Sequence, residues 1–139
     1  MKRNATAVWN GSGKEGSGHL STQSGSLAKT QYSFKSRFEE GTGTNPEELM
    51  AAAHAGCFSM KLSFELGAAG FTPDEIQTRC EINLDPAKGI TSSELTCTAK
   101  VPGIDEAKFG ELAEKAKTEC PVSKAYASLE ITLNATLQS

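Results

Sequence analysis

The chain has few of the features by which membrane-bound and exported proteins are recognised. None of its segments approaches the roughly 20 consecutive apolar residues needed to span a bilayer, and the nearest is the alanine-rich stretch 49–58. The start of the chain contains no apolar run of the length that a signal peptide needs, and polar glycine and serine residues follow. The sequence therefore predicts a soluble, cytoplasmic protein with no membrane partner.

An excess of charge of one sign is also missing. The 14 Lys and Arg residues stand against 17 Asp and Glu residues, which leaves a net charge of -3 over 139 residues. This balance gives no broad affinity for a phosphate backbone, so we expect no nucleic-acid partner. The share of hydrophobic residues, 37%, is close to that of an ordinary folded protein. Because the length suits one compact domain, we expect a single domain over residues 1–139.

Cysteine pairs with the spacing of redox or zinc motifs are absent as well. The four cysteines are Cys57, Cys80, Cys97 and Cys120, and no two of them form a Cys-x-x-Cys pair. A thioredoxin-like motif and a zinc knuckle both lack their signature, so metal binding has little support. Because the cytosol keeps most thiols reduced, the cysteines predict free thiols, some of them reactive, and not a structural disulfide framework.

The first 44 residues are rich in glycine, serine and threonine, yet they are not a featureless tail. Apolar and aromatic residues alternate over residues 5–9 and again over 32–36, with glycine-containing turns between these segments. Alternation of this kind is typical of half-buried strands. The pattern predicts a strand meander within residues 1–44.

The segment Asn45-Pro46-Glu47-Glu48 predicts the start of a long helix over residues 45–69. Asparagine caps free backbone N–H groups, proline suits the first helical position, and acidic residues favour the positive helix end. The helix is apolar almost all round, which is typical of a buried helix. We expect its small and apolar side chains to pack within the fold or against a second copy of the chain.

Residues 74–139 continue with a hairpin, two helices and a final strand. Alternation over 80–84 and 95–101 around a turn at 85–89 places Cys80 almost opposite Cys97 on one inward face. These two cysteines are interpreted as core residues.

A helical spacing begins at Asp105, and Pro121 both ends that helix at Cys120 and opens a short second one. Apolar residues alternate once more from Leu129 onward, which predicts the final strand. The order of elements predicts an α+β fold with predominantly antiparallel pairing.

Cys57 and Cys120 are the cysteines best placed for chemistry. Burial of Cys57 in an apolar helix raises a thiol pKa, so a reactive Cys57 needs a nearby cation. Cys120 lies between one helix end and the start of the next, where a helix dipole favours the thiolate. His54 shares a helix face with Cys57 and leaves a cysteine hydrolase open as an alternative. A third orienting group and an oxyanion hole are not identifiable.

Arg37, held by Glu47, is the candidate for the missing cation. A carboxylate can hold a guanidinium by paired hydrogen bonds, leaving further N–H groups to stabilise a thiolate and bind a peroxide oxygen. Glu47 and Cys57 are ten residues apart on the predicted helix, a rise of about 15 Å. A second subunit that brings the start of its helix to Cys57 supplies the charged pair despite this separation. This favours a dimer with shared sites.

Residues 37–49, 52–60 and the later Cys120-Pro121-Val122-Ser123 resemble the OsmC (osmotically inducible protein C) family along essentially the whole chain. The resemblance implies antiparallel sheets wrapped around long central helices in an intertwined homodimer. It also implies a thiol-dependent peroxidase related to organic hydroperoxide resistance proteins, acting on organic hydroperoxides and on hydrogen peroxide. By position, Cys57 corresponds to the peroxidatic thiol and Cys120 to the resolving thiol, with Arg37 and Glu47 as the supporting charged pair.

The resemblance also implies that the protein binds no cofactor and that an external dithiol, of the dihydrolipoyl type, reduces the disulfide back to two thiols. Two other functions remain open from the residues alone. One is the hydrolase that uses Cys57 and His54, and the other is a noncatalytic dimer that binds an apolar ligand beside its central helices.

Overall fold

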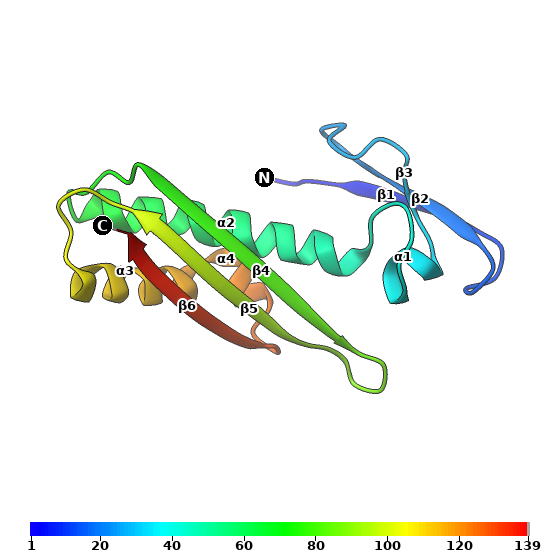
Figure 1. Cartoon of the computed structure of the whole chain (residues 1–139). Helices are drawn as coiled ribbons and strands as arrows, with labels where there is room; N and C mark the ends of the chain where they lie inside the picture. The colour runs from blue at the N-terminus through cyan, green and yellow to red at the C-terminus, as the bar shows by residue number, and fades with distance from the viewer. Residues whose placement is uncertain (139) are drawn as a thin grey trace. The chain divides into compact units, whose positions relative to one another are not determined.

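The segments with alternating apolar residues near the N-terminus form a small strand meander. The computed structural model describes residues 1–138 and forms two compact units, Met1–Leu49 and the chain from Met50 onward, which are taken in turn (Figure 1). In the first unit, β1 (Ala5–Asn10), β2 (Ser17–Thr22) and β3 (Thr30–Tyr32) form an antiparallel sheet in the order β1-β2-β3. The predicted strand meander is confirmed.

One strand of this meander ends earlier than the alternation over 32–36 predicts. Residues Phe34–Phe38 form the short helix α1, because Ser33 and Ser36 make a reciprocal cap. The Ser33 hydroxyl accepts from the Ser36 amide at 3.2 Å, and the Ser36 hydroxyl accepts from the Ser33 amide at 2.8 Å. The strand prediction was therefore wrong for residues 34–36, where local side-chain capping outweighs the alternating pattern.

The long helix α2 runs over Pro46–Ala68. As its sequence predicts, the side chain of Asn45 accepts a hydrogen bond from the Glu48 amide at 2.8 Å. The amide of the same side chain donates to the Ser36 carbonyl oxygen at 2.9 Å, so the cap also ties α1 to the first turn of α2. This arrangement sets the position of Glu47 relative to α1.

In the second unit, β4 (Glu75–Asp85) and β5 (Gly89–Lys100) form the predicted hairpin. The final strand β6 (Glu130–Gln138) pairs with β5 in parallel, which gives the order β4-β5-β6. The parallel pairing follows from the helical connection that returns the chain to the same end of the sheet. Pairing is thus predominantly antiparallel, with β5–β6 as the exception.

The helical connection consists of α3 (Glu106–Glu119) and α4 (Pro121–Ala125). Asp105 caps α3 by accepting from the Lys108 amide at 2.7 Å. Cys120 ends α3 in an extended conformation, φ -56° and ψ 125°, as expected for a residue that precedes a proline. The helix–Cys120–Pro121–helix junction predicted from the sequence is confirmed.

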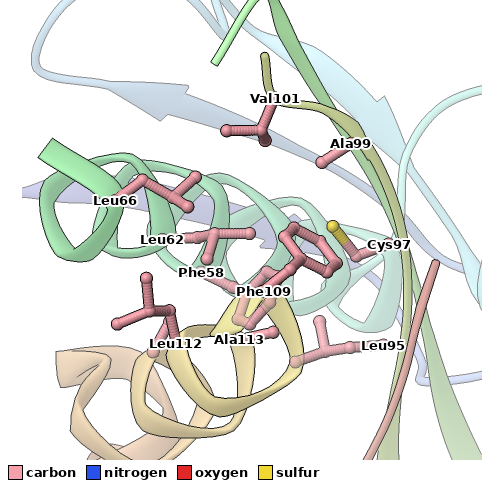
Figure 2. Packing of buried hydrophobic residues seen from close by; sticks show 11 residues of the cluster. Phe58, Leu62, Leu66, Leu95, Cys97, Ala99, Val101, Phe109, Leu112 and Ala113 are labelled. Atoms are coloured by element: carbon pink, nitrogen blue, oxygen red, sulfur yellow. The ribbon is translucent and has the colours of Figure 1, made fainter. Parts of the chain in front are cut away.

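The core of the second unit lies between α2, α3 and one face of β5 (Figure 2). Residues four apart on α2 supply one side of it, and alternate residues of β5 supply another. The buried members are Phe58, Leu62, Leu66, Leu95, Cys97, Ala99, Val101, Phe109, Leu112, Ala113 and Ala116.

Two large apolar side chains of α2 in the second unit lie outside this core. Met60 and Phe64 remain 65% and 68% exposed. Such large apolar side chains on a helix beside a buried stripe are a feature of surfaces that meet a partner. None of the helices within residues 1–138 combines the length and apolarity needed to cross a membrane.

Candidate active site

Cys57 lies on α2 beside the core and at the edge of an open groove. Its neighbour Phe58 is fully buried, whereas Cys57 itself is only partly buried. The groove has a volume of about 310 Å³, and its wall is apolar apart from one lysine. Its lining residues are Gly56, Cys57, Met60, Lys61, Phe64 and Pro121. A thiol at the edge of an apolar groove can meet a small organic molecule without facing open solvent.

The structure brings Cys120 to Cys57. Cys120 is fully buried at the end of α3, and its side chain acts on the Cys57 thiol as a hydrogen-bonding neighbour. Both thiols are free, as are Cys80 and Cys97. Two reduced thiols that are neighbours are the starting point from which a disulfide can form.

The surroundings of Cys57 within this unit do not favour its thiolate. Burial raises the pKa of the Cys57 thiol above its ordinary value, and the neighbouring Cys120 thiol raises that pKa further. A hydrogen bond from the backbone of Val122 acts in the opposite direction and lowers it. Because the raising effects dominate, rapid attack by Cys57 at neutral pH requires an additional positive charge near the sulfur.

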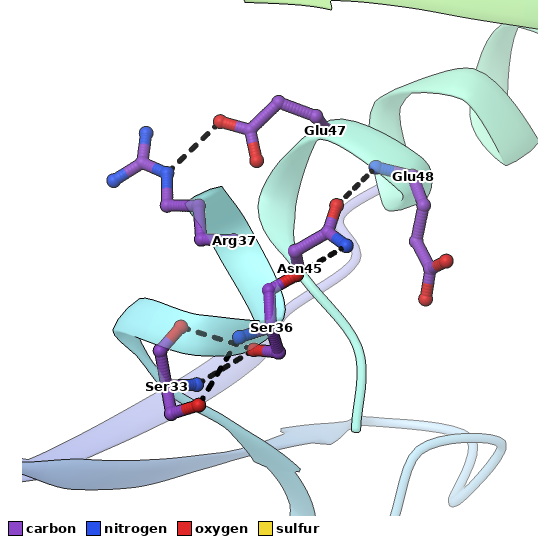
Figure 3. A network of polar contacts seen from close by, with 6 residues as sticks. All are labelled: Ser33, Ser36, Arg37, Asn45, Glu47 and Glu48. Atoms are coloured by element: carbon purple, nitrogen blue, oxygen red, sulfur yellow. Dashed lines mark hydrogen bonds and ion pairs between the residues drawn. The ribbon is translucent and has the colours of Figure 1, made fainter. Parts of the chain in front are cut away.

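Arg37 and Glu47 form the ion pair that their residue types predicted (Figure 3). The guanidinium Nε of Arg37, on α1, donates to Glu47 Oε1, in the first turn of α2, at 3.0 Å. The contact is a single bond and not the paired geometry that was expected. Within residues 1–138 neither terminal nitrogen of Arg37 is taken up by the carboxylate, so both remain able to bind a ligand.

The two members of the Arg37–Glu47 pair differ in their further contacts. The guanidinium lies over the Phe38 ring, 5.1 Å from the ring centroid, an arrangement that attracts a cation to the aromatic face. The Glu47 side chain is only 10% exposed, and its Oε2 is buried without a hydrogen-bond donor in the described part of the chain. A buried carboxylate oxygen of this kind normally has a partner.

His54 is not directed at Cys57. The imidazole is fully buried, and its Nδ1 lies 2.6 Å from the Ser93 hydroxyl on β5, while its Nε2 lies 2.7 Å from the Ser123 hydroxyl on α4. With both ring nitrogens engaged by serines, no nitrogen is left to take a proton from Cys57. The geometry therefore argues against the hydrolase. Sequence reasoning missed both serines, because they lie 39 and 69 residues away from His54.

Cys80 and Cys97 lie on the inward face of the hairpin, as expected, but not almost opposite each other. Cys80 pairs with Leu95 and Cys97 pairs with Thr78, so the two cysteines are diagonal neighbours. Cys97 is fully buried in the core. Cys80 is partly buried, with its sulfur 3.2 Å from the Ser93 hydroxyl. Burial raises the pKa of both thiols.

A second charged cluster, which sequence reasoning did not single out, lies behind the groove. Glu65 is nearly buried and accepts from Lys61 at 2.8 Å and from Lys115 at 2.9 Å. Lys61 also reaches Glu119, the last residue of α3, at 3.4 Å. The two lysines hold the pKa of Glu65 well below its ordinary value, at about 2. Only the Lys61–Glu65 spacing, one helical turn, was readable from the sequence.

The described part of the chain has no candidate metal-binding site. Across residues 1–138 no group of three or more His, Cys, Asp and Glu side chains is arranged to hold a metal ion. The reactive groups at the apolar groove are the thiols of Cys57 and Cys120.

Comparison with known proteins agrees with this arrangement. The family model for OsmC-like protein matches residues 39–134, a range that contains Glu47, Cys57 and Cys120. The chain is 47% identical to the peroxiredoxin OsmC of Escherichia coli strain K12, over 100% of this chain and 99% of that protein. It is 33% identical to the organic hydroperoxide resistance protein of Xanthomonas axonopodis pv. citri, over 67% of each.

A solved structure gives the same result for the fold. An organic hydroperoxide resistance protein from Elizabethkingia anophelis superposes with a TM-score of 0.75 at 25% identity, over 99% of this chain and 97% of that one. From its α+β fold, its adjacent thiols and its full-length similarity, the chain belongs to the OsmC family.

Proposed function

We propose that Cys57 and Cys120 carry out the reduction of organic hydroperoxides, with Cys57 as the peroxidatic thiol and Cys120 as the resolving thiol. The chain is a thiol-dependent peroxidase of the kind that its relatives, a peroxiredoxin and organic hydroperoxide resistance proteins, are named for. The observation that carries the proposal is the Cys120 thiol lying against Cys57 at the edge of an apolar groove.

In the first step the Cys57 thiolate attacks the distal oxygen of the hydroperoxide. The O–O bond breaks, an alcohol leaves with a proton from solvent, and Cys57 becomes a sulfenic acid. The groove has a volume of about 310 Å³ and a mostly apolar wall, which suits the organic part of an alkyl hydroperoxide better than it suits water. We therefore place organic hydroperoxides ahead of hydrogen peroxide as substrates.

In the second step the Cys120 sulfur attacks the Cys57 sulfenic acid. A disulfide forms and the sulfenic oxygen leaves as water, so the peroxide has accepted two electrons from the two thiols. An external dithiol then reduces the disulfide by thiol–disulfide exchange and completes the cycle. A dihydrolipoyl-type dithiol is the proposed reductant, and chemistry at two thiols needs no prosthetic group.

Arg37 and Glu47 are proposed to serve Cys57 across a homodimer. The thiol needs a cation, and the ten residues between Glu47 and Cys57 correspond to about 15 Å of helical rise. Arg37 has terminal nitrogens free for a thiolate and a peroxide oxygen, and Glu47 orients it. The exposed Met60 and Phe64 beside the groove provide an apolar surface that a second subunit would cover.

The cytoplasm is the proposed compartment, because the cycle requires reduced Cys57 and Cys120 thiols and a supply of reducing dithiol. Peroxide turnover with a dithiol present, measured for the wild type and for Cys57→Ser, tests the function. We expect consumption of an organic hydroperoxide by the wild type and none above background by the variant. Hydrolysis of a thioester or an ester without any reducing thiol would support the hydrolase instead. Affinity for an apolar ligand that stays intact in Cys57→Ser, with no peroxide consumption by the wild type, would support the binding protein.

A further inference from the structure

The buried ring of His54 is the only imidazole among the described residues of the second unit, and the proposed reaction steps do not use it. It is fully buried between α2, β5 and α4, and both neighbouring serines, Ser93 and Ser123, are buried as well. Burial lowers the pKa of His54 below its ordinary value of 6.5, so the ring is neutral at physiological pH. A neutral imidazole has one donor and one acceptor, and the two serine hydroxyls can complement both.

The contact between His54 and Ser123 repeats the contact between the two thiols one helical turn away. His54 precedes Cys57 by three residues on α2, and Ser123 follows Cys120 by three residues at the start of α4. His54 meets Ser123 at 2.7 Å, and Cys57 meets the Cys120 side chain. The same two segments are thus joined at His54 by the hydrogen bond to Ser123, and at Cys57 by the Cys120 thiol and the Val122 backbone.

The segment that carries Cys120 has little to hold it in place by itself. Helix α4 is five residues long, and its N-cap residue Cys120 makes no side-chain capping bond. A single helical turn is marginal without tertiary contacts. Helix α4 and the next residue contact α2 at several points, two of them on His54. Ser123 bonds the His54 ring, and the Tyr126 ring packs edge-on against it at 5.2 Å. The Tyr126 hydroxyl donates to the Met50 carbonyl oxygen at 3.1 Å, and the Val122 backbone bonds Cys57.

We propose that His54 is a positioning residue for disulfide formation: through Ser123 it holds the Cys120–Ser123 segment against α2, so that the Cys120 sulfur is presented to the sulfenic acid of Cys57. The inference rests on the proposed pairing of Cys57 with Cys120. The step it assists forms one S–S bond and breaks one S–O bond, and the sulfenic hydroxyl leaves as water with the proton of the Cys120 thiol. His54 contacts neither reacting sulfur in this account.

The test separates the two chemical steps in single turnover. Ser123→Ala removes the hydroxyl that joins His54 to the Cys120 segment, and Ser93→Ala is the matched control because it removes the other bond of the same ring. One equivalent of cumene hydroperoxide is added to reduced protein, and peroxide loss reports the first step. Trapping of the sulfenic acid by a 1,3-diketone and mass spectrometry of the disulfide report the second.

We expect Ser123→Ala to slow disulfide formation by about fivefold to tenfold, as for loss of one buried hydrogen bond, and to slow peroxide loss less. Sulfenic acid should accumulate. Ser93→Ala should lower the melting temperature comparably yet leave the ratio of the two rates near that of the wild type. Ser123→Thr, which retains a hydroxyl, should restore that ratio.

Equal slowing of both steps by Ser123→Ala, equal effects of the two serine variants on the second step, or no effect at all would overturn the inference. If Ser123→Ala does not fold, His54→Gln takes its place, because glutamine keeps polar contact with one serine at a time. A wild-type ratio of the disulfide-formation rate to the peroxide-loss rate in His54→Gln would also overturn the inference. Failure of the wild type to form a Cys57–Cys120 disulfide would instead contradict the proposed function, so the two failures are distinguishable.

Discussion

The chain holds two pairs of neighbouring cysteines, one on helices and one on a hairpin, and they differ in what surrounds the sulfur. Burial raises the pKa of Cys57, Cys80 and Cys97 alike. Cys57, however, meets the thiol of Cys120 and borders an open groove, whereas Cys97 is sealed in the core. A low pKa is therefore not what singles out Cys57 and Cys120 as the proposed reactive pair. Access and an adjacent thiol do so.

The largest expected effect contrasts the two pairs through Cys120. Cys120→Ser should still consume one equivalent of organic hydroperoxide but should lose dithiol-supported turnover on the order of a hundredfold or more, because a tethered thiol has a very high effective concentration. Cys80→Ala should retain turnover within about twofold, as is usual away from the reacting groups. Coupled peroxide assays measure both. A Cys80→Ala variant as inactive as Cys120→Ser would mean that the hairpin pair carries the reaction.

A second prediction concerns the cation that the surroundings of Cys57 lack. Arg37→Met should raise the pKa of Cys57 and slow peroxide attack by about tenfold or more, since a nearby opposite charge shifts such a pKa by about one to three units. Glu47→Gln should have a smaller effect of the same sign, and the double variant should lose less than the sum of both changes. The pH dependence of Cys57 alkylation in a background without the other three cysteines measures the shift.

Lys35→Met is the matched control for Arg37→Met, because Lys35 is also a cation on α1 and is exposed. It should leave both the alkylation profile and the rate unchanged. If Lys35→Met and Arg37→Met behave alike, general surface charge and not the Arg37–Glu47 pair governs the thiol.

The two faces of α2 give a third contrast. Leu62→Ala removes a fully buried side chain and should lower the free energy of unfolding by about 2–5 kcal/mol. Phe64→Ala removes an exposed side chain and should change monomer stability by less than about 0.5 kcal/mol, yet weaken dimerisation. Chemical unfolding and sedimentation at low protein concentration distinguish these effects. A fully active wild-type monomer would contradict the shared-site dimer.

The smallest expected effect is a pH dependence of stability at Glu65. The pKa of Glu65 is lowered from 4.5 to about 2 in the folded protein by Lys61 and Lys115. The unfolded chain therefore binds the proton more readily, so this contribution to stability is present above about pH 4.5 and is lost as the pH falls toward 2. Glu65→Gln should reduce the change of the urea unfolding midpoint with pH over that range. An unchanged slope would show that the cluster adds nothing.

Local signals in the sequence predicted most of the fold. Asn45 and Asp105 mark helix starts by their own capping bonds, and Pro121 separates α3 from α4 through its effect on Cys120. These features depend on residues a few positions apart. Helix α1 was missed because a Ser33–Ser36 cap within an alternating segment is a weaker signal than the alternation itself.

Long-range features could not be predicted in the same way. The parallel pairing of β6 with β5 depends on the path of two intervening helices, and no residue pattern encodes that register. The Arg37–Glu47 ion pair was predicted from its residue types and exists, whereas the roles of Arg37, Glu47, Cys57 and Cys120 in the reaction stay predictions. The engagement of His54 by Ser93 and Ser123 joins residues distant in sequence, which is why His54 was weighed as a base and not as a structural contact of α4.

The most direct test of the central claim is the identity of the disulfide that a hydroperoxide produces. Reduced protein is treated with one equivalent of cumene hydroperoxide, the remaining thiols are alkylated, and the peptides are mapped by mass spectrometry. The account predicts a bond between Cys57 and Cys120, with Cys80 and Cys97 alkylated. A stable bond between Cys80 and Cys97 as the turnover product, with Cys57 and Cys120 alkylated, would contradict it.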